Sequence, residues 1–252
     1  MAGNLTGRHI VVTGAASGMG EAAALELAAS GASLALWDIN LPAASALATR
    51  LQDQGTRCLA LGVDVSRDAE VAAAMQQSVA HLGQIDGAFN NAGIGMPTTP
   101  FETLSEAEFD RIVAVNLKGV WLCMKHQFQH MRVIGGGAIV NNASVSGLVA
   151  LAGQGAYTAT KHGVVGLSKA AAVEGAAANI RVNAICPGAV RTPILQHLEQ
   201  AGITEAALAG MSPQGRIAEP VEIAHAVVWL LSPQSSFVTG AALPIDGGWV
   251  AQ

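Results

Sequence analysis

The sequence is poor in charged and aromatic residues, and it lacks any uninterrupted hydrophobic run of membrane length. Charged residues make up 12% and aromatic residues 4% of the 252 positions, whereas hydrophobic residues make up 51%. Apolar stretches such as 22–27 and 170–173 are broken by Glu26 and Glu174, and a membrane-spanning helix needs about 18 apolar residues in a row. We therefore expect no membrane segment and a protein that buries much of its chain in a large core.

An excess of basic residues is also missing, and cysteines are few. The thirteen lysines and arginines are scattered singly and the net charge is −5, which argues against a nucleic-acid partner because such proteins usually present a basic stripe. Cys58, Cys123 and Cys186 are widely spaced, as expected for reduced core thiols rather than disulfides or a zinc site. The first residues contain no signal-peptide core, so we expect a cytoplasmic protein. The low charge also suggests self-association.

Short apolar runs alternate with longer helical patterns along the chain. We expect strands at 10–13, 34–38, 59–63, 87–90, 138–142 and 180–185, and helices near 20–29, 43–52, 69–81, 107–131 and 157–175. This alternation predicts an α/β fold with a single Rossmann-type, doubly wound parallel sheet. Segments 94–104 and 188–215 fall outside the alternation and should lie at the carboxyl ends of the strands, where ligands bind. We predict one domain over 1–252 with a substrate flap at about 188–215.

A glycine-rich loop follows the first expected strand. Gly14, Gly18 and Gly20 are spaced as Gly-x-x-x-Gly-x-Gly at the junction with a helix. Glycines there let the backbone approach a pyrophosphate, and the helix N-terminus presents free N–H groups and a positive dipole end. Glycine-rich turns also arise for steric reasons alone, so the loop needs support from other residues.

An acidic residue supplies that support. Asp38 closes the second expected strand near the ~20-residue offset at which an acid meets the adenosine ribose. Its charge would repel a 2′-phosphate, which favours NAD over NADP; the alternative is a helix-capping role before Pro42. Asp64, followed by Val65 at the end of the third strand, is placed to meet the adenine or to cap a helix.

Tyr157 and Lys161 are four residues apart on an expected helix, so they share one face. Tyr157 is the only tyrosine of the chain, and with a pKa near 10 a tyrosine is a poor base at neutral pH. A neighbouring ammonium and an oxidised nicotinamide stabilise the phenolate. Lowering the pKa by roughly 2 units requires about 2.7 kcal/mol of interaction. A packing role for the tyrosine is the alternative.

Taken in order, these motifs resemble the short-chain dehydrogenase/reductase family over essentially the whole chain. The matching residues are Thr13-Gly14-x-x-x-Gly18-x-Gly20, Asn90-Asn91-Ala92-Gly93, Asn116, Ser144, Tyr157-x-x-x-Lys161 and Pro187-Gly188. The resemblance implies an oxidoreductase that transfers a hydride between a nicotinamide ring and a secondary alcohol or ketone. It also implies a seven-stranded parallel sheet with helices on both faces, and a homotetramer.

The resemblance further implies four catalytic residues. Tyr157 is the general acid/base, Ser144 hydrogen-bonds the substrate oxygen, and Lys161 lowers the tyrosine pKa and binds the nicotinamide ribose. Asn116, through a helix irregularity, positions a water that links Lys161 to solvent. The expected cofactor-binding residues are Gly14, Ser17, Gly18, Met19, Gly20, Asp38, Asp64, Val65, Asn90 (near the adenosine ribose), Ala92, Gly93, Tyr157, Lys161, Pro187, Gly188, Val190 and Thr192.

Two departures from relatives refine the expected activity. Ser17 stands where many NADPH-using relatives carry arginine, which together with Asp38 favours NAD. Segments 135–137 and 176–178 lack the basic residues of relatives that act on carrier-protein thioesters. The runner-up is an NADPH-dependent 3-oxoacyl reductase. A non-catalytic nucleotide-sensing or scaffold protein is the alternative from another class, and the complete catalytic set argues against it.

The expected substrate pocket is mostly apolar and consists of Ser144, Ser146, Met96, Gln154, Ile194 and Leu195. Arg191 is the only fixed charge close by. Burying an anion without a paired cation is costly, whereas apolar surface gains ~25 cal/mol per Å² on burial. We therefore expect a neutral, apolar alcohol or ketone; a solvated Arg191 is favoured over one that binds an anionic substrate.

His126 and His130 have a spacing that two metal ligands can share on a helix. No third ligand is suggested nearby, so we expect polar roles at the surface or at an interface. The sequence predicts no metal site.

Overall fold

The computed structural model describes residues 4–193 and 204–252, which form a seven-stranded parallel sheet between two layers of helices. The strand order is β3-β2-β1-β4-β5-β6-β7. This arrangement confirms the predicted doubly wound sheet. The strands are β1 (His9–Thr13), β2 (Ser33–Asp38), β3 (Cys58–Gly62), β4 (Gly87–Asn90), β5 (Gly137–Asn142), β6 (Ile180–Pro187) and β7 (Ala242–Ile245).

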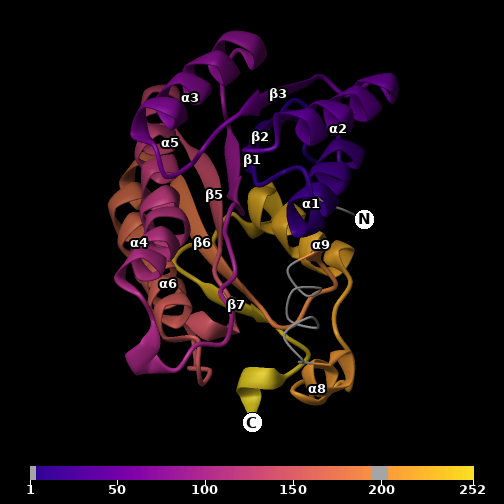
Figure 1. The fold of residues 1–252 in the computed structure, drawn as a ribbon. Helices are drawn as coiled ribbons and strands as arrows, with labels where there is room; N and C mark the ends of the chain where they lie inside the picture. Colours follow the sequence, from indigo (N-terminus) through magenta and orange to yellow (C-terminus); the bar gives the residue numbers. More distant parts are fainter. Residues whose placement is uncertain (1–3, 194–203) are drawn as a thin grey trace.

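The helices divide between the two faces of the sheet (Figure 1). They are α1 (Gly18–Ala29), α2 (Leu41–Asp53), α3 (Asp68–Leu82), α4 (Glu106–Val113), α5 (Val120–Ile134), α6 (Gly155–Gly175), α8 (Glu205–Gly210) and α9 (Pro220–Leu231). Side chains of neighbouring strand residues point to opposite faces. Ile10 and Val12 therefore enter the core beneath α1 and α9, whereas Val11 enters the core beneath α3, α5 and α6.

The sheet reverses its winding beside β1. The chain runs outward from β1 to β3 and then crosses back, so that β4 pairs with the other side of β1. In an open α/β sheet, the loops that leave the two sides of such a point separate and open a crevice at the carboxyl ends of the strands. The glycine loop after β1 and the Asn90-Asn91-Ala92-Gly93 turn after β4 both start at this crevice.

Three elements differ from the expectations. The single helix expected over 107–131 is α4 and α5 joined by a π-helical turn at Ala114–Gly119. Strand β7 and helix α9 lie outside the segments that the sequence pattern located. Residues 194–203 of the expected flap fall outside the described residues. In the ranges 4–193 and 204–252, no helix is long and apolar enough to cross a membrane.

Candidate active site

A groove of about 340 Å³ lies at the carboxyl edge of the sheet. Residues at the ends of β1, β2, β4, β5 and β6 and on helix α6 contribute to it. The lining residues are Gly14, Ser17, Gly18, Met19, Asp38, Ile39, Val63, Asp64, Val65, Asn91, Ala92, Gly93, Ile94, Val115, Asn142, Ala143, Ser144, Tyr157, Lys161, Pro187, Gly188, Thr192 and Pro193. Most of the residues expected to bind a cofactor are thus brought together.

The glycines of the loop serve two purposes. Gly14 and Gly18 have φ angles of +61° and +55°, a backbone conformation that residues with a Cβ rarely adopt. Both glycines line the groove. A Cβ on Gly18 would lie 3.2 Å from Thr192, so it would fill the groove between α1 and the segment after β6. A Cβ on Gly20 would instead overlap the carbonyl oxygen of Gly14. Gly20 therefore permits close packing of α1 on β1; it does not line the groove, contrary to the expectation.

Asp38 fixes the glycine loop and faces the groove. Its Oδ2 accepts a hydrogen bond from the backbone N–H of Ala16 (2.9 Å), and Oδ1 accepts one from Asn40 (2.8 Å). The cap of α2 is Asn40, whose side chain accepts from Ala43. The helix-cap alternative for Asp38 is therefore wrong, and its carboxylate stands at the end of β2 beside the groove.

Asp64 and Val65 also line the groove. Asp64 Oδ1 accepts hydrogen bonds from the backbone N–H and the hydroxyl of Ser66, at 2.9 and 2.7 Å. The N-cap residue of α3 is Arg67. Asp64 thus stabilises the turn before α3 and is not the cap of that helix.

The two asparagines after β4 have different places. Asn90 is only 1% exposed, and its Nδ2 donates to Gln127 and Asn141, which ties β4 to α5 and β5. The side chain of Asn90 therefore points into the core and not into the groove, and a contact of this residue with the cofactor stays a prediction. Asn91, within the expected turn, lines the groove, and Asn142 at the end of β5 lies beside it; the sequence reasoning missed Asn142.

Ser144, Tyr157 and Lys161 meet at the inner part of the groove. Ser144 follows β5, and the other two lie on successive turns of α6. The Lys161 ammonium is 5.4 Å from the centre of the Tyr157 ring and donates to the backbone oxygen of Asn142 (2.8 Å). A hydrogen bond joins the side chains of Ser144 and Tyr157.

Burial controls the protonation of this cluster. It lowers the pKa of Lys161 to about 8, from an ordinary value of 10.5. It raises the pKa of Tyr157, and the hydrogen bond from Ser144 opposes that shift only in part. The sequence analysis expected a lowered tyrosine pKa, whereas in the protein without cofactor, burial raises it. A buried tyrosine that keeps its proton can donate it to an oxygen that gains negative charge.

Asn116 lies within the π-helical turn, which confirms the expected helix irregularity. Its Oδ1 accepts from the backbone N–H of Ile94, and its Nδ2 donates to the backbone oxygen of Ile94, both at 2.8 Å. The side chain is 1% exposed and fixes the position of Ile94, which lines the groove. A water held by Asn116 stays a prediction.

Several other expected contacts are buried away from the groove. Ser146 is 1% exposed and Met96 is 5% exposed, the latter packed with Tyr157 in a small apolar cluster. Val190 is buried and bridges to Ala218. None of these three residues is among those that line the groove, and their contacts with substrate or cofactor stay predictions. Gln154 donates to the backbone oxygen of Met96, and Ile194 and Leu195 lie outside the described residues.

Arg191 is held by two carboxylates. Its guanidinium forms two hydrogen bonds to Glu205, at 2.8 and 2.9 Å, and a third to Glu219 at 2.9 Å. These partners raise its pKa further above the ordinary value. The two negative charges compensate the arginine. Anion binding, which the sequence analysis disfavoured, has no unpaired cation here, and the expected solvated arginine is instead ion-paired and joins Glu205 of α8 and Glu219 before α9 to the segment after β6.

The two histidines four residues apart bind different partners. His126 Nε2 lies 2.8 Å from Asp68, and His130 accepts a hydrogen bond from the backbone of Ile85 (3.0 Å). Among the residues that the structure describes, no group of three or more histidine, cysteine, aspartate or glutamate side chains could hold a metal ion.

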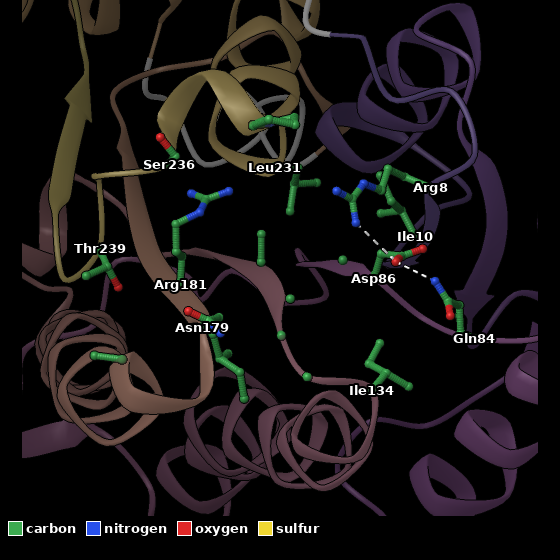
Figure 2. Close-up of a pocket in the computed structure, with 18 of the residues that line it drawn as sticks. Arg8, Ile10, Gln84, Asp86, Ile134, Asn179, Arg181, Leu231, Ser236 and Thr239 are labelled. Carbon is green, nitrogen blue, oxygen red and sulfur yellow. Dashed lines mark hydrogen bonds and ion pairs between the residues drawn. The ribbon is translucent and has the colours of Figure 1, made fainter.

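A second and larger cavity, of about 850 Å³, lies at the amino ends of the strands. Its charged side chains bind one another or the backbone. Figure 2 shows Arg8 and Gln84 directed at Asp86. The hydrogen bonds that they donate to Asp86 Oδ1 are 3.3 and 2.7 Å long. Arg181 donates to backbone oxygens that include those of Leu230 and Ser232. This cavity contains no tyrosine and no glycine loop joined to a helix N-terminus among its described lining residues.

Known proteins resemble this chain over nearly its whole length. The family model described as enoyl-(acyl carrier protein) reductase matches residues 14–250. Cis-4-hydroxycyclohexanecarboxylate dehydrogenase of Sinomonas cyclohexanicum is 43% identical over 244 residues, which cover 97% of each chain. A 2,5-dichloro-2,5-cyclohexadiene-1,4-diol dehydrogenase of Sphingobium indicum is 43% identical, covering 98% of this chain and 99% of its own.

Solved structures agree in fold. Levodione reductase superposes with a TM-score of 0.94 at 39% identity, covering 98% of this chain and 99% of that one. The 3-ketoacyl-(acyl-carrier-protein) reductase of Brucella melitensis, solved with NADH, gives 0.91 at 36% identity, covering 97% and 99%.

Proposed function

The chain belongs to the short-chain dehydrogenase/reductase family and interconverts secondary alcohols and ketones, and from this premise we propose that it is an NAD(H)-dependent dehydrogenase of small, neutral cyclic alcohols. One observation carries the proposal. Tyr157, Ser144 and Lys161 line the same groove as the glycine loop and Asp38. A proton donor and a dinucleotide cradle thus share one cavity.

The residues of the groove fit a dinucleotide. Gly14 and Gly18 leave the groove free of side chains where α1 begins, and the N-terminus of α1 favours a negatively charged group there. Asp38 stands at the β2 end as a hydrogen-bond acceptor for ribose hydroxyls. When bound, the nicotinamide supplies or accepts the hydride.

The protein's own residues handle the proton. In ketone reduction, Tyr157 donates the proton of its hydroxyl to the substrate oxygen, and in alcohol oxidation it takes that proton back. Ser144, hydrogen-bonded to Tyr157, holds the substrate oxygen beside the phenol. Lys161 places a positive charge beside the ring and stabilises the phenolate that remains after donation. Asn116 acts through Ile94, which it holds at the groove wall.

NAD rather than NADP follows from the charge at the end of β2. The carboxylate of Asp38 lies beside the groove and would repel a 2′-phosphate. Ser17, which also lines the groove, supplies no positive charge to offset it. The Brucella melitensis relative solved with NADH supports a nicotinamide cofactor but does not decide between the two dinucleotides.

A small cyclic substrate is supported by the relatives and by the composition of the groove. Two relatives are named for cyclic alcohols: one for a hydroxycyclohexanecarboxylate, which carries a negative charge, and one for a dichlorocyclohexadienediol, which is neutral. They support a cyclic substrate, and the preference for a neutral one rests on the groove. Ile94, Val115 and Pro193 line the groove with apolar surface. Arg191, bound by Glu205 and Glu219, offers no unpaired cation for a carboxylate. A homotetramer and a cytoplasmic location are further proposals, and the three buried free thiols support the latter.

The proposal is tested by NAD+ reduction over a panel of alcohols, repeated with NADP+. The panel contains cyclohexanol, a cyclohexanediol, 4-hydroxycyclohexanecarboxylate, a sugar and a 3-hydroxyacyl thioester. We expect the highest kcat/KM for the neutral cyclic alcohols with NAD+, and the same order of preference in Arg191→Ala. A preference for the carboxylate that Arg191→Ala abolishes would contradict the substrate assignment. Preference for the thioester with NADP+ would favour a 3-oxoacyl reductase.

A further inference from the structure

A chain of side-chain amides fixes the orientation of Asn142 at the end of β5. Asn91 Nδ2 donates to the backbone oxygens of Thr13 and Gly14, at 3.1 and 3.0 Å. The other end of that amide, Asn91 Oδ1, must therefore accept, and it accepts from Asn142 Nδ2 at 2.9 Å. These acceptors identify the nitrogen end of both side-chain amides. Because Asn142 Nδ2 faces Asn91, the oxygen Asn142 Oδ1 points away from Asn91.

This oxygen has no hydrogen-bond partner among the described residues, although it is shielded by the protein. Asn142 is 5% exposed and lines the groove. The backbone oxygen of the same residue already accepts from Lys161. A buried carbonyl oxygen without a partner costs free energy. A donor that binds in the groove would remove that cost.

We propose that Asn142 Oδ1 accepts a hydrogen bond from a hydroxyl of the nicotinamide ribose, which makes Asn142 a cofactor-positioning residue. The inference rests on the proposed function, because it requires a dinucleotide in this groove. It assigns the side chain two bonds at once. One amide end holds the glycine loop through Asn91, and the other holds the reactive half of the cofactor.

The position of Asn142 in the sheet selects that half of the dinucleotide. Asp38 ends β2 and Asn142 ends β5, and β1 and β4 lie between them. At ~4.8 Å between neighbouring strands, the two residues stand roughly 14 Å apart. A dinucleotide whose adenosine ribose meets Asp38 therefore places its other half over β5.

The chemistry of the oxygen selects the group. A carbonyl oxygen only accepts, and ionised phosphates only accept as well, so a phosphate is excluded. A ribose hydroxyl can donate to Asn142 Oδ1 and accept from the Lys161 ammonium, which lies against the same residue. The amide N–H₂ of the nicotinamide is the other donor in that half, and the ligand series below separates the two.

The experiment measures dissociation constants of ADP, ADP-ribose and NADH for the wild type and for Asn142→Leu, by quenching of tryptophan fluorescence. Leucine has a similar volume and no polar atoms. We expect ADP-ribose and NADH to bind roughly 3- to 10-fold more weakly to the variant, as for one lost hydrogen bond. The affinity for ADP, which lacks the nicotinamide ribose, should stay within twofold.

Other outcomes overturn the inference in distinguishable ways. A loss for NADH alone would assign the oxygen to the amide of the nicotinamide, and an equal loss for ADP would show that Asn142 acts only by holding the glycine loop. Unchanged affinities would show that the oxygen binds no cofactor group. A wild type that binds neither ADP-ribose nor NADH contradicts the proposed function itself. If Asn142→Leu does not fold, Asn142→Ser, which is too short to reach the same position, is measured with the same ligands.

Discussion

The two edges of the sheet carry cavities of opposite character. The cavity at the amino edge is the larger, at about 850 Å³ against about 340 Å³ at the carboxyl edge. Its charged groups bind each other, as Arg8 does with Asp86. At the carboxyl edge, Asn142 keeps an acceptor without a partner, and Lys161 is buried beside a tyrosine without a carboxylate bound to it among the described residues.

In this comparison, the groove that gathers the candidate catalytic residues is the smaller of the two cavities, and its lining includes an unpartnered acceptor. Polar groups that satisfy one another contribute to stability, and a ligand would have to displace those bonds. A buried donor or acceptor without a hydrogen-bond partner, or an ionisable group whose pKa is shifted by burial, is stabilised when a ligand supplies the missing partner or charge. Changes at the carboxyl edge should therefore alter catalysis, whereas matched changes at the amino edge should alter stability alone.

The largest effect is expected for Tyr157→Phe, which removes only a hydroxyl. Loss of the proton donor should lower kcat by ~10²–10⁴, while the dissociation constant of NADH should change little because the ring is kept. The control is Ser236→Ala, which removes a hydroxyl from the amino-edge cavity and should leave kcat unchanged. Steady-state kinetics and NADH titration check both. Near wild-type turnover in Tyr157→Phe would contradict the assignment of Tyr157 as the proton donor, and with it the claim that the carboxyl edge is the catalytic one.

The next effect concerns the choice of dinucleotide. Asp38→Asn keeps an acceptor for the backbone N–H of Ala16 and removes the negative charge. The ratio of kcat/KM for NAD+ over NADP+ should fall by roughly tenfold or more, because two charges near a protein surface interact by a few kcal/mol at contact.

The matched control for Asp38→Asn is Asp86→Asn, which removes an equal charge at the amino edge. It should lower stability because an amide accepts at one end only: with Oδ1 kept for Arg8 and Gln84, its Nδ2 would face the backbone N–H of His9, which donates to Oδ2 in the wild type. It should leave the cofactor ratio unchanged. If the two variants shift the ratio equally, the effect belongs to net charge and the assignment of Asp38 is wrong.

A further effect, on stability and not on catalysis, is a dependence of the free energy of unfolding on pH. Burial lowers the pKa of Lys161 to about 8, whereas the unfolded chain keeps the ordinary value of 10.5. Between these pH values the unfolded chain binds a proton that the folded protein does not, so the free energy of unfolding rises with pH. Relative to Lys161→Met, the wild type should gain on the order of 2 kcal/mol from pH 8 to pH 10.

Urea unfolding at each pH measures this difference, since the other titrating groups are shared by the two proteins. Arg8→Met at the amino edge removes a cation that does not titrate in this range and should run parallel to the wild type. A flat difference between wild type and Lys161→Met would mean that Lys161 keeps its ordinary pKa.

The sequence specified the glycine loop and the Tyr157–Lys161 pair well because both depend on local chemistry. The positive φ of a glycine and the shared face of an i, i+4 pair on a helix depend on local sequence, and they do not require contacts with distant parts of the chain. The same reasoning did not separate the two asparagines after β4: Asn90 was singled out as a cofactor contact, whereas the side chain of Asn90 is buried in the core and Asn91 lines the groove. Neighbouring residues of a strand point to opposite faces, so a motif of two asparagines does not say which of them faces a ligand.

Other errors arose where contacts are distant in the chain. Arg191 reads as an available cation until Glu205 and Glu219 meet it, 14 and 28 residues further on. Helix α9 is apolar along most of its length, so it lacks the periodic pattern of a surface helix. A local signal was nevertheless present, because Glu219, Pro220 and Glu222 form a capping box with proline at the first helical turn.

The π-helical turn at Ala114–Gly119 sets the rotation of everything that follows it. A π turn holds about one residue more than an α turn, so the side chains of α5 are offset by roughly 100° from those of a continuous α-helix. Ile112 before the turn and Gln127 after it are both buried, although they serve different neighbours. Deleting one residue in the turn would make the helix regular and rotate Gln127 off Asn90. The π-helical turn thus allows the helical segments before and after it to bury Ile112 and Gln127 against different neighbours.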